Sequence, residues 1–101
     1  MERAVLEKTQ IPVMITPYEY KKGTAYCIEG DASKSCGVLH FSHEFTFSIL
    51  MENNTPTFLG GWEIASEDFD YPDGEEGVKC LEYFHPGLYE DVLTELKKIH
   101  K

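Results

Sequence analysis

The fold of this 101-residue chain is decided by one stretch, VLHFSHEFTFSILM, at residues 38–51. Its odd positions are mostly apolar and its even positions are mostly polar. Successive side chains of a β-strand point to opposite faces of the sheet, so the pattern predicts a strand with one apolar and one solvated face. Fourteen residues is long for a strand, and we expect a bend or bulge near His43.

The segment before this strand predicts a β-hairpin. Residues 11–20 alternate apolar and polar side chains, although Pro12 and Pro17 each lack a backbone hydrogen-bond donor. We therefore expect an edge strand or a broken strand there. The turn signal KKG, at residues 21–23, connects it to a partner strand at residues 24–30.

The segment after it predicts two more strands. Residues 58–65 form the first, in which Gly60 and Gly61 indicate a bulge or a close backbone approach. Three of its side chains are expected on one face: Phe58, Trp62 and Ile64. Residues 77–85 are apolar and aromatic, and we expect them to form the second.

The C-terminal residues 86–101 predict a helix. Five apolar residues fall at helical spacing: Tyr89, Val92, Leu93, Leu96 and Ile99. Acidic side chains lie near its beginning and lysines near its end, as the helix dipole favours. The chain is thus expected to be a single α+β domain, residues 1–101, with an antiparallel meander of about five strands packed against this helix. Four aromatic residues are expected to build the face that the helix covers: Phe41, Phe45, Phe47 and Trp62.

The net charge of −9 is concentrated in the middle of the chain. There is no Lys or Arg between Ser35 and Val78, and that stretch contains nine of the 18 acidic residues. The other nine acidic residues are balanced by nine Lys and Arg residues. Such a block repels nucleic acid and attracts cations or basic protein surfaces. We expect no direct nucleic-acid partner.

The most acidic part of this block is EDFDYPDGEEG, at residues 67–77. A calcium loop is one interpretation, but the glycine is displaced by one position from the EF-hand pattern and Lys79 stands where the last carboxylate ligand belongs. A solvated turn at YPDG is a second interpretation. A recognition surface, in which aromatic side chains supply anchors and acids supply steering, is the third.

We predict a binding face from the acidic block. Its members are Glu44, Glu63, Glu67, Asp68, Phe69, Asp70, Tyr71, Asp73, Glu75 and Glu76. The outward side chains of the long strand would extend it: His40, Ser42, Thr46 and Ser48.

Histidine and cysteine spacing gives no metal or catalytic motif. His40 and His43 are three residues apart, so in an extended strand they lie on opposite faces and cannot bind one ion together. A bend would change that geometry, and Cys27, Cys36 or His85 would then be available to complete a site. No C-x-x-C pair exists and no spacing selects a Cys–His pair. We predict no metal, no cofactor and no catalytic residue.

Composition favours a cytoplasmic protein. No apolar run approaches the roughly 20 residues of a membrane span. The N-terminal segment MERAVLEKTQ has charges where a signal peptide would be apolar. The three cysteines are expected to be reduced, without a disulfide.

These observations favour a small non-enzymatic protein whose acidic face, within residues 35–78, engages a basic protein. Immunity proteins, antitoxins, anti-defence inhibitors and DNA mimics share this physics. The alternative is a small-molecule or metal-binding module, or a small enzyme, with a pocket between sheet and helix. Four residues would line that pocket: His43, Trp62, Cys80 and Tyr83. A third interpretation is an oligomerisation module that pairs strand edges, such as residues 11–16, between chains.

Overall fold

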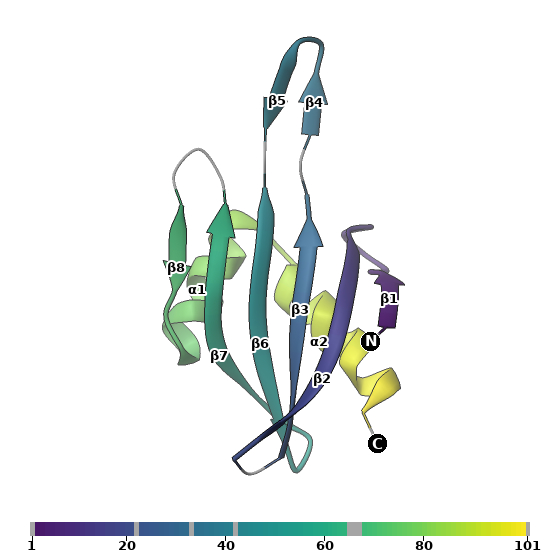
Figure 1. The fold of residues 1–101 in the computed structure, drawn as a ribbon, viewed down its shortest axis with the longest axis vertical. Helices are drawn as coiled ribbons and strands as arrows, with labels where there is room; N and C mark the ends of the chain where they lie inside the picture. Colours follow the sequence, from purple (N-terminus) through teal and green to yellow (C-terminus); the bar gives the residue numbers. More distant parts are fainter. Residues whose placement is uncertain (1, 22, 33, 42, 65–67, 101) are drawn as a thin grey trace.

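A computed structural model describes residues 2–21, 23–32, 34–41, 43–64 and 68–100, with the backbone alone described for 34–36 and 39–41. It confirms the α+β class: a six-stranded antiparallel meander is followed by two helices that pack on one face of it (Figure 1). The strand order in the sheet is β1-β2-β3-β6-β7-β8. The bounds of these strands are Glu2–Val5, Pro12–Tyr20, Gly23–Asp31, Glu44–Glu52, Thr55–Ile64 and Phe69–Tyr71.

The remaining elements are one small hairpin and the two helices. Strands β4 (Lys34–Cys36) and β5 (Leu39–Phe41) pair only with each other, and in Figure 1 they project beyond the end of the sheet between β3 and β6. Helices α1 (Gly74–Phe84) and α2 (Leu88–Ile99) lie behind the sheet in that view.

The long central strand is interrupted where the sequence predicts. It divides into β5 and β6, and His43 precedes β6. In β6 the odd residues point to the helices and are buried, as expected: Phe45, Phe47, Ile49 and Met51. This strand lies between β3 and β7, and its apolar face forms the middle of the core.

A β-bulge in β7 reverses the predicted faces of that strand. Ile49 of β6 lies opposite Phe58, whereas Ser48 lies opposite Gly60, so one residue of β7 is extra. The backbone at Gly60 has a φ of +101°, and a Cβ at Gly61 would lie 2.0 Å from the carbonyl oxygen of Thr46. The glycines therefore permit the bulge, as the sequence indicated.

The prediction that Phe58, Trp62 and Ile64 share one face was wrong, because the bulge shifts the alternation by one residue. Phe58 and Glu63 are buried on the helix side, while Trp62 and Ile64 are exposed on the other. Trp62 therefore does not belong to the face that the helices cover.

Residues 77–85 do not form a strand, contrary to prediction. Helix α1 occupies most of them and begins at Gly74, inside the acidic segment. Asp73 is its N-cap residue, and Glu75 and Glu76 lie in its first turn, where negative charge is favourable. Leu81 is fully buried. Helical spacing of the apolar side chains, rather than alternation, places that residue in the core.

Helix α2 confirms the predicted C-terminal helix. Leu88, Val92 and Leu96 are fully buried, and Leu93 and Ile99 pack against the core. Asp91 of its first turn is also buried. Its carboxylate accepts hydrogen bonds from the backbone of Lys8 (3.1–3.2 Å) and from the backbone and hydroxyl of Thr9 (2.8 and 2.9 Å).

That contact fixes the turn between β1 and β2, and β1 pairs with Pro12–Ile15. The sequence predicted an edge strand or a broken strand here. Instead β2 is one strand from Pro12 to Tyr20, and its first half is not a sheet edge because β1 pairs with it. Within the described residues no helix is long and apolar enough to cross a membrane. Cys27 and Cys80 are free thiols. The side chain of Cys36 lies outside the described part.

Candidate functional site

The face of the sheet opposite the helices carries an acidic and aromatic surface. Strand register places six residues in one row across it, from β1 to β8: Arg3, Met14, Glu29, Thr46, Trp62 and Asp70. The neighbouring row contains Asp31, Glu44 and Ile64. We call these nine residues the open face. Their side chains alternate with the buried residues of the same strands.

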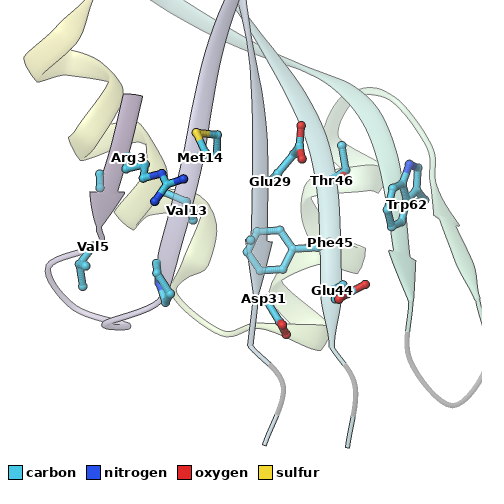
Figure 2. A pocket seen from close by; sticks show the side chains of 13 residues that line it. Arg3, Val5, Val13, Met14, Glu29, Asp31, Glu44, Phe45, Thr46 and Trp62 are labelled. Atoms are coloured by element: carbon cyan, nitrogen blue, oxygen red, sulfur yellow. The ribbon is translucent and has the colours of Figure 1, made fainter. Parts of the chain in front are cut away.

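A hollow of about 680 Å³ lies on the open face. Figure 2 shows the carboxylates of Glu29, Asp31 and Glu44 on adjacent strands, with Arg3 toward one side and Trp62 toward the other. Trp62 is 41% exposed. The hollow thus combines three acidic groups with one basic group and an accessible aromatic ring.

Most of the predicted acidic residues are exposed, but they do not form one continuous face. Glu44 and Asp70 belong to the open face, whereas Asp73, Glu75 and Glu76 surround the beginning of α1. Asp68 is exposed just before β8. Segment 67–77 is therefore neither a simple turn nor a loop, since it contains β8 and the start of α1. Among the described residues, its acids do not converge as a group of metal ligands.

Three predicted members of the binding face have other positions. Glu63 and Tyr71 are buried and point into the core, and Phe69 is partly buried against it. They are removed from the exposed surface by the bulge in β7 and by the pairing of β8 with that strand. Glu67, like Ser42, lies outside the described residues, as does the side chain of His40.

Glu63 is the centre of a buried polar cluster that the sequence did not predict. The hydroxyl of Tyr71 donates to Oε1 at 2.5 Å. Nε2 of His85 lies 2.8 Å from Oε1 and 3.0 Å from Oε2, and Nδ1 of His43 lies 3.4 Å from Oε2. Both oxygens of the carboxylate therefore have partners, as a buried charge requires.

The environment keeps Glu63 ionised. Burial alone would raise the pKa of this carboxyl group, but the hydrogen bonds from His85 and Tyr71, the charge of His85 and the contact with His43 together hold its pKa below the ordinary value. Burial and the neighbouring carboxylate raise the pKa of Tyr71, so this phenol remains protonated as a donor.

Three elements converge to build the cluster. Glu63 comes from the end of β7, opposite Phe45. His43 is held before β6 by a 2.8 Å backbone hydrogen bond from Ala32 to its carbonyl oxygen. His85 is the C-cap of α1, and its backbone N–H donates to Leu81 at 2.8 Å.

His43 and His85 also border a second hollow, of about 670 Å³, between the end of the sheet and the α1–α2 connection. Thr9, Gln10 and Asp31 contribute polar groups to its wall. The pocket predicted from the sequence is not formed as expected. Only His43 of its four residues lines this hollow, while Trp62 lies on the open face and Tyr83 is 83% exposed.

One sequence signal does locate the cluster in retrospect. Gly60 and Gly61 indicated a bulge, and an extra residue there turns Glu63 inward. Its partner His85 could not be found in the same way, since it required α1 to be a helix.

Comparison of the chain with protein-family models, curated proteins and solved structures finds no match in any of the three.

Proposed function

We propose that this chain is a small non-enzymatic binding protein that uses the open face to engage a basic protein partner. The observation that carries the proposal is the hollow in which Glu29, Asp31 and Glu44 lie beside the exposed ring of Trp62. A central aromatic anchor with acidic groups around it suits a partner rich in Lys and Arg.

Charge across the whole chain supports the same partner chemistry. The net charge of −9 attracts basic surfaces over a distance and repels phosphate backbones. Such association is fast and sensitive to salt. Immunity proteins, antitoxins, anti-defence inhibitors and DNA mimics work in this way, and the proposal assigns the chain to that functional class and not to direct nucleic-acid or membrane binding.

A cytoplasmic location is part of the proposal. Its support is the presence of free thiols at Cys27 and Cys80, since disulfides are rare in the reducing cytosol.

The test is affinity capture of the partner from the native host with the immobilised chain, at low and high salt. The open-face variant carries Glu29→Gln, Asp31→Asn and Glu44→Gln. The matched control removes the same charge from the helices, by Glu75→Gln, Glu76→Gln and Glu90→Gln. We expect a basic protein to be captured by the parent and the control, to be lost at high salt, and to be much depleted with the open-face variant.

Equal depletion by the two variants would show that net charge, and not this face, governs binding. Undiminished capture by the open-face variant would refute the proposal directly.

A further inference from the structure

We propose that His43, Glu63 and His85 form a binding site for one divalent transition-metal ion of the Zn²⁺ type. This site is separate from the open face: it lies at the helix-covered side of the sheet, where α1 ends. The inference does not depend on the proposed function, because none of the three ligands belongs to the open face, although Asp31 lines both hollows.

The donor set fits this class of ion. Two imidazoles and one carboxylate are favoured by Zn²⁺, Fe²⁺, Co²⁺ and Ni²⁺, whereas Ca²⁺ and Mg²⁺ require oxygen ligands. Two histidines and one carboxylate supply three protein ligands, which is the number at zinc sites that keep a position for water or another ligand.

The distances fit as well. With bonds of about 2.0–2.1 Å, tetrahedral ligand atoms lie roughly 3.3 Å apart. Here His85 Nε2 is 2.8–3.0 Å from the Glu63 oxygens and His43 Nδ1 is 3.4 Å from Oε2. One ligand atom from each of the three residues lies within 4.8 Å of the other two.

Glu63 is already prepared for this role. Its side chain is fully buried, and both of its carboxylate oxygens already lie within 3.4 Å of a histidine ring nitrogen. The Tyr71 hydroxyl donates to Oε1 and orients the carboxylate, as an outer partner of a metal ligand does. On binding, the N–H protons that His85 Nε2 and His43 Nδ1 now direct at the Glu63 carboxylate leave to water, while each imidazole carries a proton on its other ring nitrogen and stays neutral, so that the two freed lone pairs form the bonds to the metal.

The site has an entrance. The side chain of His43 is 37% exposed, whereas that of His85 is 7% exposed. Both border the hollow of about 670 Å³ beside the α1–α2 connection, whose wall includes Thr9, Gln10 and Asp31. The remaining coordination position can therefore face this hollow, where water reaches it.

The experiment is a titration of the full chain, freed of metal with a chelator, with ZnCl₂ by calorimetry and with CoCl₂ by visible absorption. We expect one ion per chain and a Co²⁺ spectrum without the thiolate charge-transfer band. Zn²⁺ should also raise the melting temperature, because the metal binds the folded state only.

Variants identify the ligands. His43→Ala is the main one, because this side chain is the most exposed of the three ligands, and it should weaken binding by more than the 10–100-fold loss that an outer partner causes. Tyr71→Phe should weaken it by about 10–100-fold. His100→Ala is the matched control: this histidine contacts Tyr26 at the other end of α2 and should leave the affinity unchanged.

A purely structural role of the cluster makes a different prediction. In that case neither ion binds in a 1:1 ratio, and the proposal fails. It also fails if His43→Ala, shown to be folded by circular dichroism, binds as tightly as the parent. Loss of binding on replacing Cys27, Cys36 and Cys80 by Ser, with His43 intact, would assign the metal to the thiols and overturn the site.

Discussion

Carboxylates on the two faces of the sheet differ in what surrounds them. On the helix side, Glu63 and Asp91 are buried. Glu63 accepts a hydrogen bond from the Tyr71 hydroxyl, and Asp91 accepts one from the backbone N–H of Thr9. On the open face, Glu29 and Glu44 are exposed and lie beside a hollow. Burial therefore divides the acidic residues into those that stabilise the fold and those that are available to a partner, although all carry the same charge.

The largest effect is expected for apolar packing on the helix side. Leu96→Ala removes a fully buried side chain from the core and should lower the free energy of unfolding by about 2–5 kcal/mol. Ile64→Ala, on the open face and 36% exposed, is the matched change and should cost about 0.5 kcal/mol or less. Urea denaturation measures both. Similar costs for the two variants would contradict the assignment of the faces.

Asp91→Asn should have the next largest effect. The carboxylate holds the turn at Lys8 and Thr9 against the first turn of α2, and hydrogen bonds to a charged group contribute roughly 1.5–3 kcal/mol. We expect a loss in that range. Glu90→Gln, an exposed neighbour in the same helical turn, is the control and should change stability by no more than about 0.5 kcal/mol. A small loss in both would show that the turn is held by other contacts.

The contribution of Asp91 should depend on pH. Burial alone would raise the pKa of this carboxyl group, but hydrogen bonds from the backbone and hydroxyl of Thr9 and from the backbone of Lys8 lower it overall. A lowered folded-state pKa means that the stabilisation is complete above the unfolded value of about 3.9 and is lost as the pH falls through the folded value. The difference between parent and Asp91→Asn should therefore be constant near neutral pH and shrink below about pH 4. Denaturation at a series of pH values tests this, and a constant difference down to the lowest pH would refute it.

Sequence reasoning succeeded where one periodicity governed a whole segment. Strand β6 and helix α2 have a single apolar stripe each, and the predicted stripes do pack into the core, although Leu50 and Leu88 are buried without having been predicted. It failed at segment 67–85, whose nineteen residues contain a short strand and a helix and carry mixed signals. One helix-start signal was present: Asp73 is followed three residues later by Glu76, the spacing of a capping box.

The buried cluster could not be predicted for a related reason. Alternation along β7 placed Glu63 outside, and only the extra residue at the bulge turns it inward. His43 and His85 are 42 residues apart in sequence, and they meet only after the sheet and α1 have packed. A single sequence shows residue types and spacing, but not such a register shift between two strands.

The smallest effect on stability is expected on the open face, and it completes the comparison. Replacing Glu29, Asp31 and Glu44 together by Gln, Asn and Gln removes exposed charges that repel one another across β3 and β6. We expect the free energy of unfolding to stay within about 0.5 kcal/mol of the parent or to rise slightly.

Association of this triple variant with the captured basic partner should slow several-fold and lose most of its salt dependence, because exposed charges act mainly through long-range steering. Trp62→Ala should instead raise the dissociation rate, since a partner that covers the ring loses its anchor. Stopped-flow association and dissociation rates at several salt concentrations separate the two effects. If the triple variant unfolds easily, or if Trp62→Ala alters only the association rate, the open face does not have the role that its exposed carboxylates indicate.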